Sequence, residues 1–257
     1  MKIAVCLKQV ISPDAPLTLD EARGWIRETE LPRETNEPDL HALELALSLR
    51  DRHQGEVTAV TVGPESAVAT LRDALARGAD HAVHIVDADA FAREPLQTAR
   101  ALANILRAER HDLVLAGSQS TDFGHGQTGV LLAELLGLPH VSMVVEAALE
   151  GDNNLRARRE LEAGANQWWK TSLPGVLTVQ SGINRPRYAG VKGIMAAKKR
   201  PIRSVTFAEA HAGPPAASVT CEAMATPAAR ANTTLLTGAA PDVAAQLAER
   251  LRAALGR

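Results

Sequence analysis

Hydrophobic and polar positions follow a regular pattern from residue 1 to about residue 145. Short runs rich in β-branched residues are separated by longer segments in which apolar residues recur three and four positions apart. In the first of these segments, EPDLHALELALSLRDRH, the spacing puts Leu43, Ala46 and Leu47 on one face of a helix. The short runs KIAVCLK, EVTAVTVG, HAVHIVD and DLVLAG are almost continuously apolar, as in parallel strands covered on both faces. The pattern predicts an α/β fold with a doubly wound, mostly parallel sheet and helices on both faces.

The pattern changes after about residue 150. The run GDNNLRARREL predicts an exposed strand and QWWKTSLPGVLTVQ a second strand, which together form an appended antiparallel segment. The run INRPRYAGVKGIMAAKKRPI predicts a proline-bounded loop and a short basic helix. Beyond it the chain is rich in Ala, Thr and Pro, and PDVAAQLAERLRAALG predicts a terminal helix. We therefore expect a core at residues 1–207 and a C-terminal arm at residues 208–257 that needs another surface to order it.

The composition argues against several classes of function. The 257 residues are 46 % hydrophobic, and a formal net charge of −2 gives no global field that would recruit nucleic acid or an anionic membrane. No apolar run approaches the roughly twenty residues that span a bilayer, and the first residues do not resemble a signal peptide, so we expect a cytoplasmic protein. Cys6 and Cys221 are the only cysteines, and no Cys/His cluster has metal-ligand spacing. We expect neither a disulfide nor a metal site.

A polar stretch follows the run DLVLAG, where residues 116–129 read AGSQSTDFGHGQTG. In an open α/β sheet, ligands bind beyond the carboxyl ends of the strands. Gly124, Gly126 and Gly129 permit turns and close approach of a ligand, and a helix that begins near Gln127 would point free N–H groups at an anion such as a phosphate. Asp122 could cap that helix or accept a hydrogen bond from a ribose hydroxyl. Neither a GxGxxG after the first run nor a P-loop is present, and a loop that only reverses the chain remains the alternative.

Groups for catalysis are sparse. Ser118, Ser120 and His125 are close in sequence, but no GxSxG motif accompanies them, so we do not expect nucleophilic catalysis. Trp168 and Trp169 are adjacent in a strand, so one of them should face outward, which suggests an interface.

Four blocks of the sequence resemble the β subunit of electron-transfer flavoprotein. They are KIAVCLKQV at the start, TNEPDLHALELALSLRD at 35–51, GSQSTDFGHGQTGVLLAELLGLPHV at 117–141, and the block from GDNNLRARREL to AAKKRPI at 151–202. The resemblance covers residues 1 to about 207. Within it, RRELE, PGVLT and INRPRYAGV are most similar to bacterial members that serve methylated-amine dehydrogenases such as trimethylamine or dimethylglycine dehydrogenase.

The resemblance implies an electron carrier and not an enzyme. A member of this family forms a heterodimer with an α subunit, which holds most of one FAD, while the β subunit binds AMP as a structural nucleotide. The flavin takes electrons from a flavin dehydrogenase and passes them to a membrane quinone oxidoreductase, so the chain itself makes and breaks no bonds. No nucleic acid partner and no direct membrane insertion are implied.

The resemblance also assigns residues to sites. The AMP site would comprise residues at strand ends and helix starts, namely Cys6, Asn36, Glu37, Pro38, Asp39, Val62, Gly117, Ser118, Gln119, Ser120, Thr121, Asp122, Phe123, Gly124, His125, Gly126, Gln127 and Thr128. The segment near 184–200 resembles the loop that docks on the dehydrogenase, with Val191, where relatives commonly carry Leu, as its apolar anchor. Tyr188, Lys192, Ile194 and Met195 would complete the docking surface. Arg159 and Glu160 match residues at the contact with the flavin domain of the α subunit, on which the C-terminal arm would also pack.

Three alternatives stay open at this stage. In a bifurcating relative, the β subunit binds a second FAD in the place of AMP; the QTG form of the polar stretch favours AMP. A stand-alone adenine-nucleotide-binding regulator, similar to a universal stress protein, is compatible with the repeating strand and helix pattern alone. For residues 184–200, a basic loop that only covers the sheet edge is the structural alternative.

Overall fold

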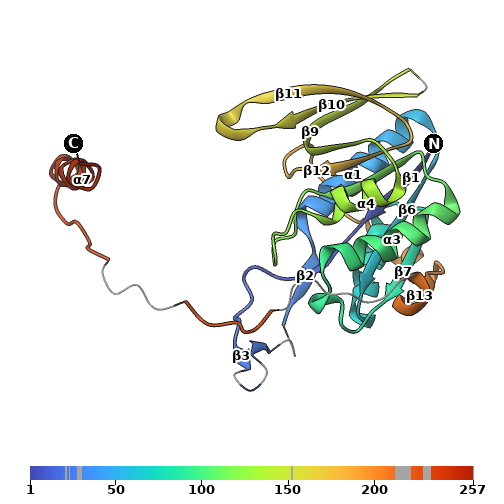
Figure 1. Cartoon of the computed structure of the whole chain (residues 1–257), viewed down its shortest axis with the longest axis horizontal. Coiled ribbons are helices and arrows are strands. Elements are labelled where there is room, and N and C mark those ends of the chain that lie inside the picture. Colours follow the sequence, from blue (N-terminus) through green and yellow to red (C-terminus); the bar gives the residue numbers. More distant parts are fainter. Residues whose placement is uncertain are drawn as a thin grey trace. The chain divides into compact units, whose positions relative to one another are not determined.

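The computed structural model describes residues 1–20, 22, 24–27, 31–151, 153–211, 221–227 and 233–256. The chain divides into two units (Figure 1). The larger unit comprises Met1–Leu17 and Glu28–Cys221, and the smaller unit comprises Thr18–Arg27 and Glu222–Arg257. Each unit is described separately below.

A nine-stranded sheet forms the centre of the larger unit. Seven adjacent strands are parallel to one another, which confirms the doubly wound parallel sheet predicted from the apolar runs. Two further strands continue one edge in antiparallel order. From that edge the strands are β11 (Asn166–Ser172), β10 (Asn154–Glu160), β9 (His140–Glu150), β12 (Gly175–Val179), β8 (Leu113–Gly117), β1 (Lys2–Cys6), β6 (Glu56–Gly63), β7 (His81–Val86) and β13 (Arg203–Thr206).

Alternate residues of each central strand face two separate layers of helices. In β1, Ile3 and Val5 contribute to one buried cluster, and Ala4 and Cys6 to the other. The first cluster contains residues of α1 (Glu37–His53), α2 (Val68–Arg77) and α5 (Val191–Lys199). The second contains residues of α3 (Pro95–Glu109), α4 (Thr128–Leu136) and α6 (Phe207–Ala210). Helices therefore cover both faces, as predicted (Figure 1).

Shorter elements complete the larger unit. A small antiparallel pair is formed by β2 (Gln9–Ile11) and β5 (Arg33–Thr35). Three single-turn 3₁₀ helices occur at η1 (Glu65–Ala67), η2 (Ala90–Ala92) and η3 (Glu162–Gly164).

The prediction of a single strand over QWWKTSLPGVLTVQ is wrong. The structure divides it into β11, at the edge of the sheet, and β12, which lies between β8 and β9. The division follows from burial, because every residue of β12 is buried whereas β11 is almost entirely exposed. The apolar GVLTV run is buried on both sides only if it lies between two strands. The chain therefore leaves the edge at Leu173 and Pro174 and re-enters the sheet beside β8.

The described residues of the smaller unit form a two-stranded hairpin and one helix. The hairpin pairs β3 (Leu19–Asp20) with β4 (Trp25–Ile26), and the helix is α7 (Ala240–Ala254), as the periodicity of the C-terminal segment predicts. Leu247 and Leu251, four residues apart in α7, are exposed, and so is Leu255 directly after the helix. The helix thus carries an apolar stripe that the described residues leave uncovered.

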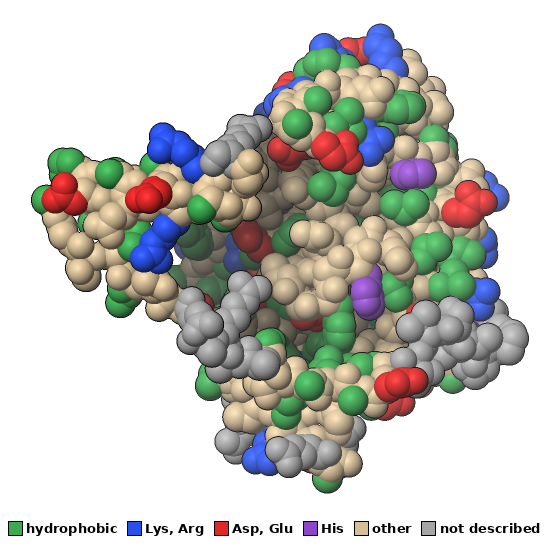
Figure 2. Space-filling view, turned by 60° about the vertical axis from the view of Figure 1, so that its left-hand side comes forward, with side chains coloured by type: hydrophobic (Ala, Val, Ile, Leu, Met, Phe, Trp, Pro, Cys, Tyr) green, Lys and Arg blue, Asp and Glu red, His purple; other side chains and the backbone are tan. Residues whose placement is uncertain are grey.

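One face of the molecule shows no separation of charge. On the face drawn in Figure 2, acidic and basic side chains are interspersed and not gathered by sign. This distribution agrees with the near-balanced formal charge of −2. Among the described residues, no helix combines the length and the apolar character that crossing a membrane requires.

Candidate functional site

The polar stretch after β8 lines a cavity beyond the carboxyl ends of the parallel strands. The cavity is open to solvent, and the space free of protein atoms in and over it is about 1010 Å³. Residues at the ends of β1, β6 and β8 line it, which is the edge where open α/β sheets hold ligands. The stretch is therefore not collapsed onto neighbouring side chains.

Most residues assigned to the AMP site line this cavity. They are Cys6, Asn36, Asp39, Val62, Gly117, Ser118, Gln119, Ser120, Phe123, His125, Gly126, Gln127 and Thr128. The remaining assigned residues are not among those that line it: Glu37, Pro38, Thr121, Asp122 and Gly124. The fold therefore brings together, at one edge of the sheet, positions that are more than a hundred residues apart in sequence.

Asp39, in the first turn of α1, ties two strand ends together. Its Oδ2 accepts a hydrogen bond of 2.7 Å from the backbone N–H of Lys8, and its Oδ1 accepts one of 2.8 Å from the backbone N–H of Gly117. Burial raises the pKa of Asp39 to about 6, although both hydrogen bonds and the charge of Lys8 act in the opposite direction. The carboxyl group is thus a buried structural clamp at the floor of the cavity.

Asn36, which precedes α1, holds the polar stretch itself. Its Oδ1 accepts from the backbone N–H of Thr121 at 3.0 Å, and its Nδ2 donates to the carbonyl of Gln119 at 3.0 Å. The side chain is buried, so it satisfies both loop groups in a place that water does not reach. The start of α1 thus fixes the loop that lines the cavity.

Glycine is required at several positions of the stretch. A Cβ on Gly117 would collide with Asp39 and lie 2.8 Å from the Cβ of Pro38, and one on Gly129 would collide with Thr178. Gly124 and Gly126 have φ of +62° and +63°, the left-handed region that glycine adopts most easily. These requirements support the interpretation that the glycines shape a ligand-facing loop.

The start of α4 faces this cavity without a side-chain cap. Gln127 is its N-cap residue and makes no capping hydrogen bond, and Gln127, Thr128 and Gly129 all line the cavity. The first N–H groups of a helix have no partner within the helix, so they can serve an anion. The alternative that Asp122 caps this helix is wrong, because Asp122 instead pairs with Lys8, with 2.7 Å between Oδ1 and Nζ.

Two cationic residues of the cavity were missed by the sequence analysis. Lys8 also donates to the hydroxyl of Ser120 at 3.3 Å and lies 4.9 Å from the centre of the Phe123 ring. Arg93 lines the cavity and pairs with Asp87, with 2.9 Å between Nε and Oδ2. Lys8 could have been found, because it follows the first apolar run directly and therefore lies at the ligand edge. Arg93 lies outside any motif that we identified.

The nucleophile candidates are not poised for attack. The hydroxyl of Ser118 donates to Oε1 of Gln180 at 2.6 Å, and the ring of His125 stacks on Phe123 with centres 5.6 Å apart. Burial, and secondarily the charge of Asp39, raise the pKa of the Cys6 thiol to about 12, so it stays protonated. Within the part of the chain that the structure describes, no cluster of three His, Cys, Asp or Glu residues could hold a metal ion.

The residues assigned to docking share one surface. Tyr188 and Val191 are 91 % and 79 % exposed, and Ile194, Met195 and Lys192 are also exposed. All but Tyr188 belong to α5, the short basic helix predicted from the sequence. An exposed apolar group of this size on one short segment is typical of an interaction site.

The residues assigned to the subunit contact lie on β10. Arg159 is half-buried and Glu160 is exposed at the end of the strand. The adjacent edge strand β11 exposes both Trp168 and Trp169, which confirms the expected outward-facing tryptophan and shows that both sides of this edge strand are open. The guanidinium of Arg156 lies over the Trp168 ring, 3.8 Å from its centre.

The fold and the cavity define an α/β protein with a cavity at the carboxyl edge of its parallel sheet, where open α/β sheets bind ligands. The model of the electron transfer flavoprotein domain family matches residues 24–210. The electron transfer flavoprotein subunit beta of Methylophilus methylotrophus is 36 % identical over 212 residues, which cover 81 % of this chain and 80 % of that protein. The subunit beta of Bacillus subtilis is 34 % identical over 206 residues, which cover 80 % and 79 %. The subunit beta of Syntrophomonas wolfei is 36 % identical over 216 residues, which cover 82 % of each chain. The chain belongs to the electron transfer flavoprotein family.

Proposed function

We propose that the chain is the β subunit of a heterodimeric electron-transfer flavoprotein, that its cavity binds AMP, and that an α subunit holds most of the FAD. The heterodimer relays electrons from a flavin dehydrogenase to a quinone oxidoreductase. The observation that carries the proposal is the cavity at the carboxyl edge, whose loop is fixed by Asn36 and Asp39. This chain supplies binding and docking and performs no bond-making chemistry.

The chemistry of the cavity suits a mononucleotide. The uncapped start of α4 supplies N–H donors for a phosphate, and Lys8 and Arg93 supply positive charge. The hydroxyls of Ser118 and Ser120 can bond to ribose, and Val62, Ala116 and Leu102 give an apolar wall for a base. The phosphate group of a bound nucleotide would compete with Asp122 for Lys8, so nucleotide binding would rearrange the ion pair between Lys8 and Asp122.

Two of the alternatives differ from this proposal in what the complex contains. A bifurcating β subunit would hold a second FAD in the cavity, so its complex would contain two flavins. A stand-alone regulator would bind an adenine nucleotide without any flavin or α subunit. Family membership favours a flavoprotein subunit over the regulator.

The surface of the larger unit supports docking to a dehydrogenase through the segment at 184–200. Val191 is a highly exposed apolar residue, and Lys192, Lys198, Lys199 and Arg200 follow it. One apolar anchor among exposed cations gives fast and weak association, as electron relay requires. The resemblance of RRELE, PGVLT and INRPRYAGV to bacterial members that serve methylated-amine dehydrogenases favours such a dehydrogenase as donor.

Two further surfaces suit an α subunit. Arg159 and Glu160 lie beside the exposed edge of the sheet, where Glu160 could pair with an arginine of the flavin domain. The stripe Leu247, Leu251 and Leu255 in the C-terminal arm is exposed and would be buried against the partner. A cytoplasmic location is part of the proposal.

Co-expression with the α subunit encoded in the same organism tests the proposed assembly. We expect one α and one β chain to co-purify with a single flavin that a pre-reduced dehydrogenase can reduce. A β chain that purifies alone as a homodimer without flavin would contradict the proposal and favour the regulator. Two flavins in each heterodimer would favour the bifurcating type.

A further inference from the structure

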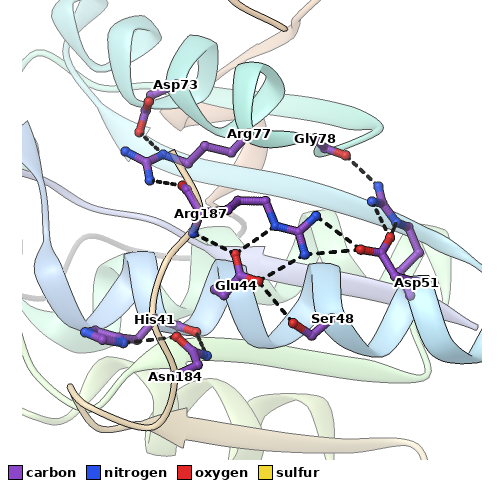
Figure 3. A network of polar contacts seen from close by, with 10 residues as sticks. His41, Glu44, Ser48, Asp51, Asp73, Arg77, Gly78, Asn184 and Arg187 are labelled. Atoms are coloured by element: carbon purple, nitrogen blue, oxygen red, sulfur yellow. Dashed lines mark hydrogen bonds and ion pairs between the residues drawn. The ribbon is translucent and has the colours of Figure 1, made fainter. Parts of the chain in front are cut away.

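The segment that leads into α5 is fastened to α1 at two points (Figure 3). Nδ2 of Asn184 donates to the carbonyl of His41 at 2.9 Å, and Nδ1 of His41 lies 3.1 Å from Oδ1 of Asn184. Three residues further on, Nε and Nη2 of Arg187 donate to the two carboxylate oxygens of Glu44 at 2.9 and 3.0 Å. His41 and Glu44 are also three residues apart, so both fastenings use one face of α1.

The ion pair between Arg187 and Glu44 is the stronger of these two contacts, the other being the hydrogen bonds between Asn184 and His41. The Glu44 side chain is only 10 % exposed, and it accepts a third hydrogen bond from the backbone N–H of Arg187 at 3.0 Å. Burial alone would raise the pKa of Glu44, but the hydrogen bonds from Arg187 outweigh it and hold the pKa below its ordinary value. A bidentate pair between a fork of donors and a carboxylate fixes direction as well as distance.

Neighbouring groups extend this pair into a network. Asp51 accepts from both Nη atoms of Arg187 at 3.1 Å, and Ser48 donates to Glu44 at 3.1 Å. From the other side, Arg77 of α2 donates to the backbone carbonyl of Arg187 at 2.6 Å. Arg187 therefore joins the segment to both α1 and α2.

The far end of the segment is fixed by close packing of α5 on α2. A Cβ on Gly193 would collide with the carbonyl of Ala76, so only glycine permits this approach. Arg72 of α2 donates to the carbonyls of Ala197 and Arg200 at the end of α5. The exposed Tyr188 and Val191 thus lie between two fixed ends.

The geometry points to Arg187 and Glu44 as positioning residues that hold Tyr188 and Val191 in a preformed docking surface, an inference that rests on the docking function proposed above. A surface that is ordered before contact loses less conformational entropy when it binds. Neither residue needs to touch the dehydrogenase, because each acts through the backbone of the segment.

Arg185 provides a matched control. Its side chain is exposed and makes no hydrogen bond or ion pair with the residues that the structure describes. Arg185→Gln and Arg187→Gln each remove one positive charge from the same loop, so they weaken electrostatic steering alike, but only Arg187→Gln breaks the pair. Glu44→Gln breaks the pair from α1 and leaves the charge of the loop unchanged.

The experiment compares these variants in the complex with the α subunit by amide hydrogen exchange and by the kinetics of flavin reduction. For the reduction we would use trimethylamine dehydrogenase pre-reduced with trimethylamine, at a salt concentration that screens steering. We expect Arg187→Gln and Glu44→Gln to speed exchange of the amides at 188–195 by about tenfold and to raise the KM for the dehydrogenase, with flavin content unchanged. Arg185→Gln should leave the exchange unchanged, and the double variant should be no worse than either single variant.

The inference is overturned if exchange at 188–195 in both pair-breaking variants equals that in Arg185→Gln. A second result would also overturn the inference. In it, Arg187→Gln and Glu44→Gln speed the exchange but keep the wild-type KM for the dehydrogenase, whereas Val191→Ala raises that KM. Failure of the docking function is a different result, in which Val191→Ala also leaves the KM unchanged.

Discussion

The buried carboxylate of Asp39 accepts a hydrogen bond of 2.8 Å from the backbone N–H of Gly117 and so links the start of α1 to the end of β8. This contact closes the floor of the cavity at the point where the polar stretch begins.

Asp39→Asn should destabilise the chain and weaken nucleotide retention. An amide has one oxygen, so it can accept from the backbone N–H of Lys8 or of Gly117 but must present its own N–H₂ to the other. A buried donor left without an acceptor costs about 1–3 kcal/mol. Chemical denaturation of the complex measures the loss, and Asp14→Asn, the same change at an exposed position, is the control. Equal stability of the two variants would contradict the clamp.

Asp39 should also give the stability a characteristic pH dependence. Because its pKa of about 6 lies above that of an unfolded chain, the folded state binds more protons between the two values. The stability due to Asp39 is therefore fully present below the unfolded pKa and is lost as the pH rises through about 6.

The free energy of unfolding, measured from pH 4 to pH 7 in the wild type and in Asp39→Asn, isolates this effect from the other carboxylates. The difference between the two proteins should decrease as the pH rises through about 6. A difference that increases with pH would show that the backbone hydrogen bonds outweigh burial.

Gly117→Ala should damage the same contact from the other side. The added methyl group collides with Asp39 and with Pro38, so α1 or β8 must shift. Forcing a methyl group into a packed site costs about 1–3 kcal/mol. Gly190→Ala is the matched control, because no heavy atom lies within 4 Å of the new methyl group. Thermal unfolding should separate the two variants, and identical midpoints would be incompatible with this packing.

Much of this architecture is encoded locally and could be predicted. The periodicity of apolar residues gives the strands and helices, and the order of parallel strands gives the ligand edge, which is why the polar stretch at 116–129 was expected to lie there. Non-local pairing was not accessible in the same way. In the sequence, the GVLTV run of β12 resembles a continuation of β11, but in the structure it lies between β8 and β9.

Side-chain pairs between distant segments were also missed. Lys8 and Asp122 are 114 positions apart, and Glu44 and Arg187 are 143 positions apart. No periodicity or spacing links such residues, because the fold alone brings them together. The resemblance to a family predicts Val191 as an anchor, but the network that holds its segment became visible only in three dimensions.

Val191→Ala should slow reduction of the flavin by the dehydrogenase by up to about tenfold, because two methyl groups fewer are buried on docking. Flavin content and nucleotide content should not change. Stopped-flow reduction at several salt concentrations gives the comparison with Lys198→Gln, an exposed charge on the same helix. The effect of Val191→Ala should persist at high salt, whereas that of Lys198→Gln should fade. A rate of flavin reduction that Val191→Ala leaves unchanged at every salt concentration would contradict the proposal that Val191 is the anchor.

The identity of the molecule in the cavity is the most direct test of the account. The complex with the α subunit is denatured, and the small molecules that it releases are separated and identified by mass. We predict one AMP and one FAD for each heterodimer, and a loss of AMP but not of FAD in Gly117→Ala. Release of two FAD molecules, or of FAD with no nucleotide beside it, would contradict the claim that the loop between β8 and α4 binds a structural mononucleotide.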